Sequence, residues 1–161
     1  MPDDVKAVAV PALAHRLALR GLDHLMLDVN GTLTNRGALL PGVETSINDL
    51  RPMLSVHLMS ADTFGTLEST AQLLRASAVR AASGDDKLTY LNDLGRDRCA
   101  VIGNGANDVQ VLAACALGFA VIGPEGANSV ALAAADVVCT SVLDAFGLLL
   151  EPRALAATLR P

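Results

Sequence analysis

Short, almost wholly apolar segments alternate along the chain with longer segments in which apolar residues recur every three or four positions. Leu67, Ala71 and Leu74 show this recurrence, which predicts a helix with one buried face. The short apolar segments favour parallel strands that are covered by helices on both faces. The expected strands are His24–Val29, Ser55–Met59, Val79–Ala82, Cys99–Gly103, Gly118–Ile122 and Asp136–Thr140. The alternation predicts an α/β fold, a single doubly wound domain with a parallel sheet.

Helices are expected between these strands and at both ends of the chain. They are Val5–Arg20, Val43–Leu50, Thr66–Ala76, Asp86–Leu94, Asp108–Ala114, Ser129–Ala134 and Arg153–Leu159. The segment Gly31–Gly42 breaks the alternation, and its sequence, GTLTNRGALLPG, predicts a small β-hairpin flap that turns at Asn35–Gly37. Because no linker or repeat divides the sequence, we expect one domain over residues 1–161, with its core from about residue 22 to about residue 150.

Composition narrows the classes of function. Of the 161 residues, 52% are apolar and only 2% are aromatic, so the core must be aliphatic. The formal net charge is −5, and an acidic chain without aromatic platforms is a poor nucleic-acid binder. The longest uncharged stretch, Val109–Pro124, is shorter than the roughly 20 apolar residues of a membrane span, so we expect no membrane insertion.

The first residues and the cysteines indicate a cellular compartment. The sequence MPDDVKAV carries acidic residues where a signal peptide would carry basic ones. Cys99, Cys115 and Cys139 are odd in number and form no CxxC pair, which favours buried, reduced thiols. We therefore expect a cytoplasmic protein.

Polar residues follow the expected strands at the edge of the sheet where doubly wound proteins bind ligands. Asp28 ends the first strand, Ser60 follows the second, and Asp108 follows the glycine-rich end of the fourth main strand. The carboxylates of Asp28 and Asp108 can hold Mg²⁺ through oxygen ligands. Ser60 and Lys87 can bind phosphate oxygens, and an aspartate beside bound phosphate can attack phosphorus. These residues together indicate phosphoryl transfer.

Four further features are left out of the candidate site. His57 lies within an apolar strand and is interpreted as a core histidine. Asp62 is interpreted as a cap of the helix that begins near Thr66. The segment GNGAND is a poor dinucleotide loop, because Asp108 stands where the third glycine is required. Glu125 receives no role.

The motifs resemble those of a known superfamily. Asp28–Thr34 (DVNGTLT), Ser60–Asp62 (SAD), Lys87 and Gly103–Asp108 (GNGAND) resemble, in this order, the four motifs of the haloacid dehalogenase (HAD) superfamily. More narrowly, they resemble the phosphorylation domain of P-type ATPases, with its DKTGTLT, TGD and GDGxND motifs. The chain as a whole resembles the small group of soluble P-type-ATPase-like HAD proteins, and the match extends from about Leu22 to the C-terminus. It implies a Rossmann-like HAD domain.

The resemblance assigns the covalent chemistry and the metal. It implies that Asp28 is the nucleophile and a Mg²⁺ ligand, that Asn30 offers its backbone carbonyl to the metal, and that Asp108 completes the metal site. The supporting positions, which would orient ligands and waters, are Thr32, Asn104 and Asn107.

The resemblance also assigns the phosphate. Ser60, Ala61 and Lys87 would bind a small phosphorylated substrate, and Lys87 would in addition balance the charge around Asp28. The intervals of 60 − 28 = 32 and 87 − 60 = 27 residues between motifs are too short for a cap domain. Capless relatives often cover the site with a neighbouring subunit, so the resemblance implies a homo-oligomer.

Two positions depart from the family pattern. Asn30 stands where typical phosphatases of the superfamily have an Asp that protonates the leaving group and then activates water, and P-type ATPases have Thr there. Asn104 replaces the first Asp of GDGxND, which removes a negative charge from the metal site. General acid–base catalysis contributes about 10²–10⁴-fold, so we expect slow turnover. The alternative is a regulatory or interaction protein of low or no activity that retains a Mg²⁺–phosphate site.

Overall fold

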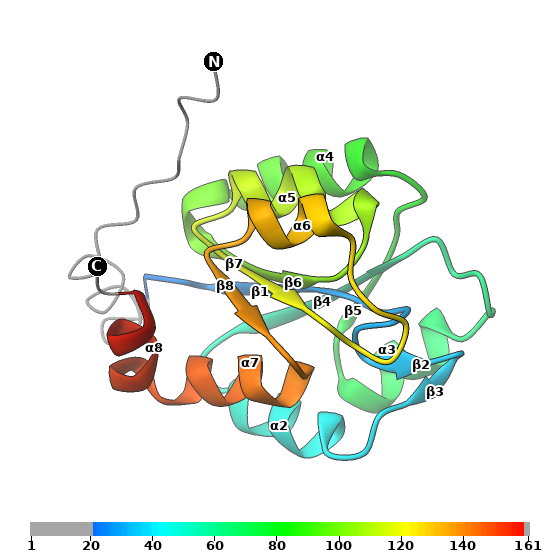
Figure 1. The fold of residues 1–161 in the computed structure, drawn as a ribbon. Coiled ribbons are helices and arrows are strands. Elements are labelled where there is room, and N and C mark those ends of the chain that lie inside the picture. The colour runs from blue at the N-terminus through cyan, green and yellow to red at the C-terminus, as the bar shows by residue number, and fades with distance from the viewer. Residues whose placement is uncertain (1–20, 160–161) are drawn as a thin grey trace.

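A six-stranded parallel sheet forms the centre of the computed structural model, which describes residues 21–159 (Figure 1). The expected helix Val5–Arg20 lies outside the described residues. The strand order is β5-β4-β1-β6-β7-β8. The strands are β1 (His24–Asp28), β4 (Ser55–Ser60), β5 (Ser77–Arg80), β6 (Cys99–Gly103), β7 (Leu117–Val121) and β8 (Val137–Cys139). This order places β1 between β4 and β6, so the ends of these three strands meet at one edge.

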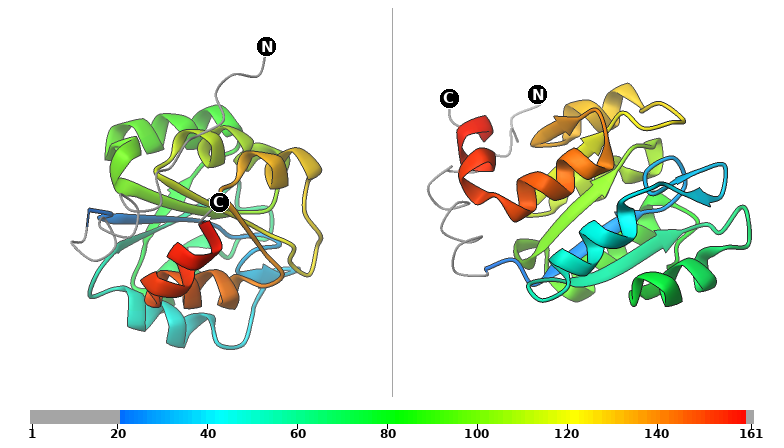
Figure 2. Two further views of the ribbon diagram at one scale, coloured as in Figure 1. Left: turned by 60° about the vertical axis from the view of Figure 1, so that its left-hand side comes forward. Right: turned by 90° about the horizontal axis from the view of Figure 1, so that it is seen from below.

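Helices cover both faces of the sheet, as the sequence predicts for a doubly wound domain (Figures 1 and 2). On one face lie α4 (Gly84–Leu94), α5 (Val109–Ala114) and α6 (Ser129–Ala134). On the other lie α2 (Val43–Leu50), α3 (Leu67–Leu74), α7 (Val142–Leu150) and α8 (Pro152–Leu159). Short 3₁₀ turns occupy Arg96–Arg98 and Ala106–Asp108. Successive residues of β1 serve both cores, because Leu25 and Leu27 face the second group of helices and Met26 the first.

One helix was not expected from the sequence. The segment of α7, VLDAFGLLL, is apolar on nearly all sides and therefore shows no helical periodicity. The helix begins after Ser141, whose hydroxyl accepts a hydrogen bond from the Asp144 amide at 3.1 Å. It packs against α2 below the sheet, where Phe146 is fully buried.

All strands of the main sheet except β6 differ by one or two residues at an end from those expected. The largest shift is in β5, which begins at Ser77 because Arg75 ends α3 in a left-handed conformation (φ 51°) and turns the chain at once into the sheet. Ser77 then pairs with His57 of β4.

The expected flap is present as a two-stranded antiparallel hairpin, β2 (Thr34–Asn35) and β3 (Ala38–Leu39). Its two turn residues, Arg36 and Gly37, both have positive φ (49° and 88°), as a tight hairpin turn requires. The flap lies at the end of the sheet where β1 terminates (Figure 1).

Two expectations from the sequence, on membrane-spanning helices and on the cysteines, can be compared with the structure. Within residues 21–159 no helix has the length and apolar character to cross a membrane. Cys99, Cys115 and Cys139 are all buried, as expected for small core residues.

His57 is a core residue, as interpreted from the sequence, and joins three elements. Its Nδ1 lies 2.8 Å from the hydroxyl of Tyr90 on α4, and its Nε2 lies 3.1 Å from Nδ1 of His24 on β1. Burial, assisted by the neighbouring His24, lowers the pKa of His57 to about 4. His57 is therefore neutral in the folded protein at neutral pH.

We expect acid to destabilise the fold through His57. Between pH 6.5, its ordinary pKa, and about 4, the unfolded chain binds a proton that the folded chain does not. The free energy of unfolding is therefore unaffected by His57 titration above pH 6.5. It falls by about 3 kcal/mol in total as the pH drops from 6.5 to about 4. Urea unfolding across this interval should show a shallower pH dependence for His57→Gln than for the wild type. Identical pH dependences would contradict this assignment.

Candidate active site

Lys87 is a fully buried cation that lies between two carboxylates. Its Nζ donates to Asp28 Oδ1 at 2.8 Å and to Asp108 Oδ1 at 2.7 Å. Lys87 and Asp108 are fully buried, and Asp28 is 6% exposed. The site thus combines residues from the end of β1, the turn after β6 and the first turn of α4, which the sequence had placed together.

The start of α4 fixes the lysine. Ser83 caps the helix by accepting from the Asp86 amide at 3.1 Å, while the Asp86 carboxylate accepts from the amides of Ala82 and Ser83 at 3.0 and 3.2 Å. Asp86 is therefore part of a capping box. Lys87, the next residue, is directed inward toward the sheet edge, where two carboxylates offset the cost of burying it.

The electrostatics of the site follow from its burial. Burial raises the pKa of Asp28 to about 7, and Asp108 adds to this effect, while Lys87 and the Thr32 hydroxyl oppose it. Burial by itself lowers the pKa of Lys87, but Asp28 and Asp108 together raise it above its ordinary value. Lys87 is therefore a cation at neutral pH, and the charge of Asp28 changes with pH near neutrality.

Asp108 is held more firmly than the sequence suggested. Its Oδ1 accepts from Lys87, and its Oδ2 accepts from the backbone amides of Asn104 and Gly105 at 3.0 and 2.9 Å. Both oxygens of this fully buried side chain are thus engaged by the protein. A metal ion at Asp108, the role expected from the resemblance, would therefore share an oxygen with Lys87 or with these backbone amides.

Thr32 links the nucleophile loop to Asn104. Its hydroxyl lies 3.2 Å from Asp28 Oδ2 and 3.2 Å from Asn104 Oδ1. The Asn104 amide group in turn donates to the carbonyl of Gly126 at 3.2 Å. Asp28 Oδ2, which Lys87 does not contact, and Asn104 Oδ1 therefore both lie beside the Thr32 hydroxyl.

Gly31 permits a close approach of two loops. It adopts a φ of 75°, and a Cβ at this position would lie 2.6 Å from Asn104 Nδ2 and 3.3 Å from Glu125 Oε2. Glu125, which received no role from the sequence analysis, is an exposed residue beside the nucleophile loop. The signal that could have found it is its place in the loop after β7, at the same edge of the sheet.

Ser60 and Asp62 follow β4 at this edge. Ser60 is buried, and its Oγ accepts from the Asp62 amide at 2.9 Å. Since Asp28 pairs in register with Met59, Ser60 lies one residue beyond it on the neighbouring strand. Asp62 accepts from the amide of Leu67, the first residue of α3, at 2.9 Å, in accord with its interpretation as a cap.

The remaining positions of the predicted site are more open. Asn30 is half-buried and bridges to Thr34, at the base of the flap. Ala61 is exposed, and Asn107 is half-buried in the turn before α5. No group of three or more His, Cys, Asp or Glu side chains among residues 21–159 is arranged to hold a metal ion.

Several solved structures with this architecture are named as HAD hydrolases or phosphatases. The 3-deoxy-D-manno-octulosonate 8-phosphate phosphatase of Moraxella catarrhalis, in complex with magnesium, phosphate and KDO, aligns with a TM-score of 0.71 and 16% identity over 92% of this chain and 98% of its own. The cobalt-bound phosphatase YrbI of Haemophilus influenzae aligns with a TM-score of 0.68 and 17% identity over 89% and 95%. A protein assigned to the HAD hydrolases in Streptomyces avermitilis aligns with a TM-score of 0.68 and 19% identity over 84% and 88%.

The chain therefore has the α/β fold of the haloacid dehalogenase superfamily, without a cap domain in its described part. No protein-family model matches the chain. It is 40% identical over 78 residues to the uncharacterized protein MJ0073 of Methanocaldococcus jannaschii, a match that covers 46% of this chain and 84% of that protein. The two proteins belong to one family.

Proposed function

We propose that this protein is a Mg²⁺-dependent phosphohydrolase of the HAD type that acts through an aspartyl phosphate on Asp28. The observation that carries the proposal is the buried Asp28–Lys87–Asp108 arrangement at the edge where three parallel strands end. Proteins of similar fold that are named as phosphatases support phosphate hydrolysis as the reaction class. Ser60, the Ala61 amide and Lys87 are proposed to bind the phosphoryl group, and Asn107 to orient it.

The oxygens that remain beside Asp28 fit a small, hard cation. Asp28 Oδ2 and Asn104 Oδ1 meet at the Thr32 hydroxyl, and carboxylate and amide oxygens are the donors that Mg²⁺ prefers. We propose that these two oxygens and the Asn30 carbonyl hold the metal, and that Asp108 holds Lys87 and the turn after β6. The bound cation would neutralise charge on the phosphoryl oxygens.

The chain's own residues account for two half-reactions. In the first, the Asp28 carboxylate attacks phosphorus, the bond from phosphorus to the alcohol oxygen breaks, and that oxygen takes a proton from solvent. In the second, water attacks the same phosphorus and loses a proton to solvent, the bond from phosphorus to the Asp28 oxygen breaks, and inorganic phosphate and the free carboxylate result. Lys87 stabilises the charge that develops beside Asp28. The amide of Asn30 cannot transfer a proton in either step, so the leaving group must depart with little assistance.

A substrate panel tests the proposal. With saturating Mg²⁺ we expect measurable hydrolysis of p-nitrophenyl phosphate and acetyl phosphate, little hydrolysis of sugar phosphates, and none after chelation. The second candidate function is a regulatory protein that binds Mg²⁺ and phosphate without turnover, and the amides of Asn30 and Asn104 favour it. If no substrate gave turnover or a trapped phosphoenzyme, the interpretation as a binding protein would replace the interpretation as an enzyme.

Restoring a carboxylate at position 30 should accelerate the reaction. Asn30→Asp supplies the missing proton donor and acceptor at almost unchanged volume, so we expect turnover of alkyl phosphates to rise by about 10-fold or more. The comparison requires saturating Mg²⁺, because the new charge lies near Asp28. Brisk hydrolysis of alkyl phosphates by the wild type, with no gain in the variant, would show that another group activates water.

Adding a charge at position 104 should strengthen metal binding. If Asn104 Oδ1 contacts the cation, Asn104→Asp should lower the Kd for Mg²⁺ by about 10-fold, as measured by calorimetry. The control Asn92→Asp adds the same charge on the exposed side of α4, where Asn92 contacts Arg96. Equal effects of the two substitutions would indicate a general charge effect and remove Asn104 from the metal site.

Four further expectations stay predictions. We propose that residues 1–161 form one domain, that the protein is a homo-oligomer, and that a neighbouring subunit covers the site beyond the flap. A cytoplasmic location is proposed with them. Sedimentation velocity measures the oligomeric state directly.

A further inference from the structure

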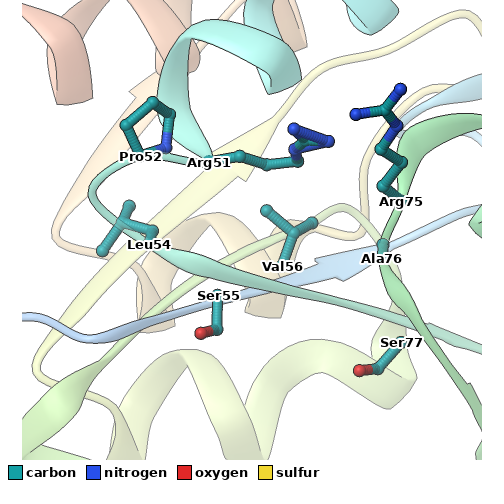
Figure 3. A pocket seen from close by; sticks show the side chains of 8 residues that line it. All are labelled: Arg51, Pro52, Leu54, Ser55, Val56, Arg75, Ala76 and Ser77. Carbon is teal, nitrogen blue, oxygen red and sulfur yellow. The ribbon is translucent and has the colours of Figure 1, made fainter.

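A groove lies at the other end of the sheet from Asp28, where β4 and β5 begin (Figure 3). Residues 51–52, 54–56 and 75–77 line it, and its volume is about 540 Å³. That volume is within the range of small-molecule sites. None of these residues belongs to the proposed active site, although β4 runs from this groove to Ser60.

Two arginines dominate the groove. Arg51 follows α2 and Arg75 follows α3, and Figure 3 shows their guanidinium groups turned toward one another on the side of β4 to which Val56 points. Ser55 and Ser77 point to the opposite side. The arginines therefore form the charged wall of the groove, and Val56 provides an apolar floor.

Neither guanidinium has a partner among residues 21–159. The other basic side chains in that part of the chain bond to a carboxylate or an amide oxygen, except Arg36 in the flap turn. These engaged residues are Arg80, Lys87, Arg96, Arg98 and Arg153. Two of three unpartnered cations thus share one groove, in a chain whose net charge is −5.

A structural role at the helix ends explains only part of this arrangement. A cation near a helix C-terminus interacts favourably with the helix dipole, at about 0.3–1 kcal/mol. That interaction does not require the two guanidinium groups to face each other, and like charges in this position repel. An oxyanion between them removes the repulsion and accepts hydrogen bonds from both planar groups.

We propose that this groove binds a small molecule through a phosphoryl dianion held between Arg51 and Arg75, with an apolar portion against Val56. Two guanidinium charges match a dianion better than the single charge of a monocarboxylate. The site is separate from the proposed phosphohydrolase centre and does not depend on it.

An NMR titration of the full-length protein with inorganic phosphate tests the proposal. Chelator keeps the protein metal-free, so that the excess of carboxylates disfavours phosphate at Asp28. We expect saturable shifts of the amides of residues 51–56 and 75–77. Shifts confined to residues 28–34 and 60–62 would place phosphate in the active site instead and overturn the proposal.

Three substitutions and a second anion make the test specific. Arg51→Gln and Arg75→Gln should each raise the Kd for phosphate at the groove by about 10-fold or more, because each removes one charge-assisted pair. The control Arg153→Gln removes the same charge from an exposed pair with Glu151 and should leave the Kd unchanged. An unchanged Kd in the first two variants, or propionate binding as tightly as phosphate, would refute the phosphoryl site.

Discussion

Asp28→Asn should reduce phosphatase turnover by about 1,000-fold or more, because an amide oxygen is too poor a nucleophile to attack phosphorus. The substitution hardly changes the volume of the side chain. It also removes a buried carboxylate whose pKa is raised to about 7, so we expect no loss of folding stability. Initial rates on p-nitrophenyl phosphate at saturating Mg²⁺ measure the effect, and circular dichroism verifies the fold. Binding of BeF₃⁻, which mimics the phosphoryl group on Asp28, should be lost as well.

The matched control for this experiment is Asp23→Asn. Asp23 is a partly exposed carboxylate that pairs with Arg98 at the opposite end of β1, so its loss should leave turnover unchanged. Wild-type turnover in Asp28→Asn would exclude the covalent mechanism. The same loss in both variants would point to damage of β1 and not to the chemistry of Asp28.

The elements with clear periodicity could be read from the sequence. Val43–Leu50 and Ser129–Ala134 form the helices expected, and Cys99–Gly103 forms the strand expected, because each has a regular apolar pattern and turn residues at its ends. The helix Val142–Leu150 could not be read in this way, since a segment that is apolar on nearly every side has no face to detect.

The sequence predicts that the site residues lie close together, but it does not predict their individual contacts. The sequence rule that ligands bind at the carboxyl ends of strands brings Asp28, Ser60 and Asp108 to one edge. It does not say which oxygen of Asp108 faces Lys87, nor that backbone amides take the other oxygen. These contacts depend on the path of the turn after β6, and Glu125 was missed for a similar reason, since a loop after β7 brings it to Gly31.

Lys87→Met should destabilise the protein by about 3–5 kcal/mol at pH 8, because it leaves Asp28 and Asp108 buried without their common cation. Urea unfolding measures the loss. The control Arg98→Met removes a cation from an exposed pair with Asp23 and should cost about 1 kcal/mol or less. Adding Asp108→Asn to Lys87→Met should recover about half of the loss, since only one buried carboxylate then remains.

The pH dependence of this variant follows from the raised pKa of Asp28. That pKa is about 7 in the folded wild type against an ordinary 3.8, and loss of Lys87 removes an interaction that lowers it. Over this interval the folded variant retains a proton that the unfolded chain has released, so its stability is greatest at low pH and declines as the pH rises through the folded pKa. The deficit relative to the wild type should therefore be largest at pH 8, where the wild type has released the Asp28 proton and the variant has not, and should shrink to a constant value below about pH 7. A deficit that is constant over this range would mean that Lys87 stabilises the fold by packing alone, and that its charge is not what holds the two carboxylates together.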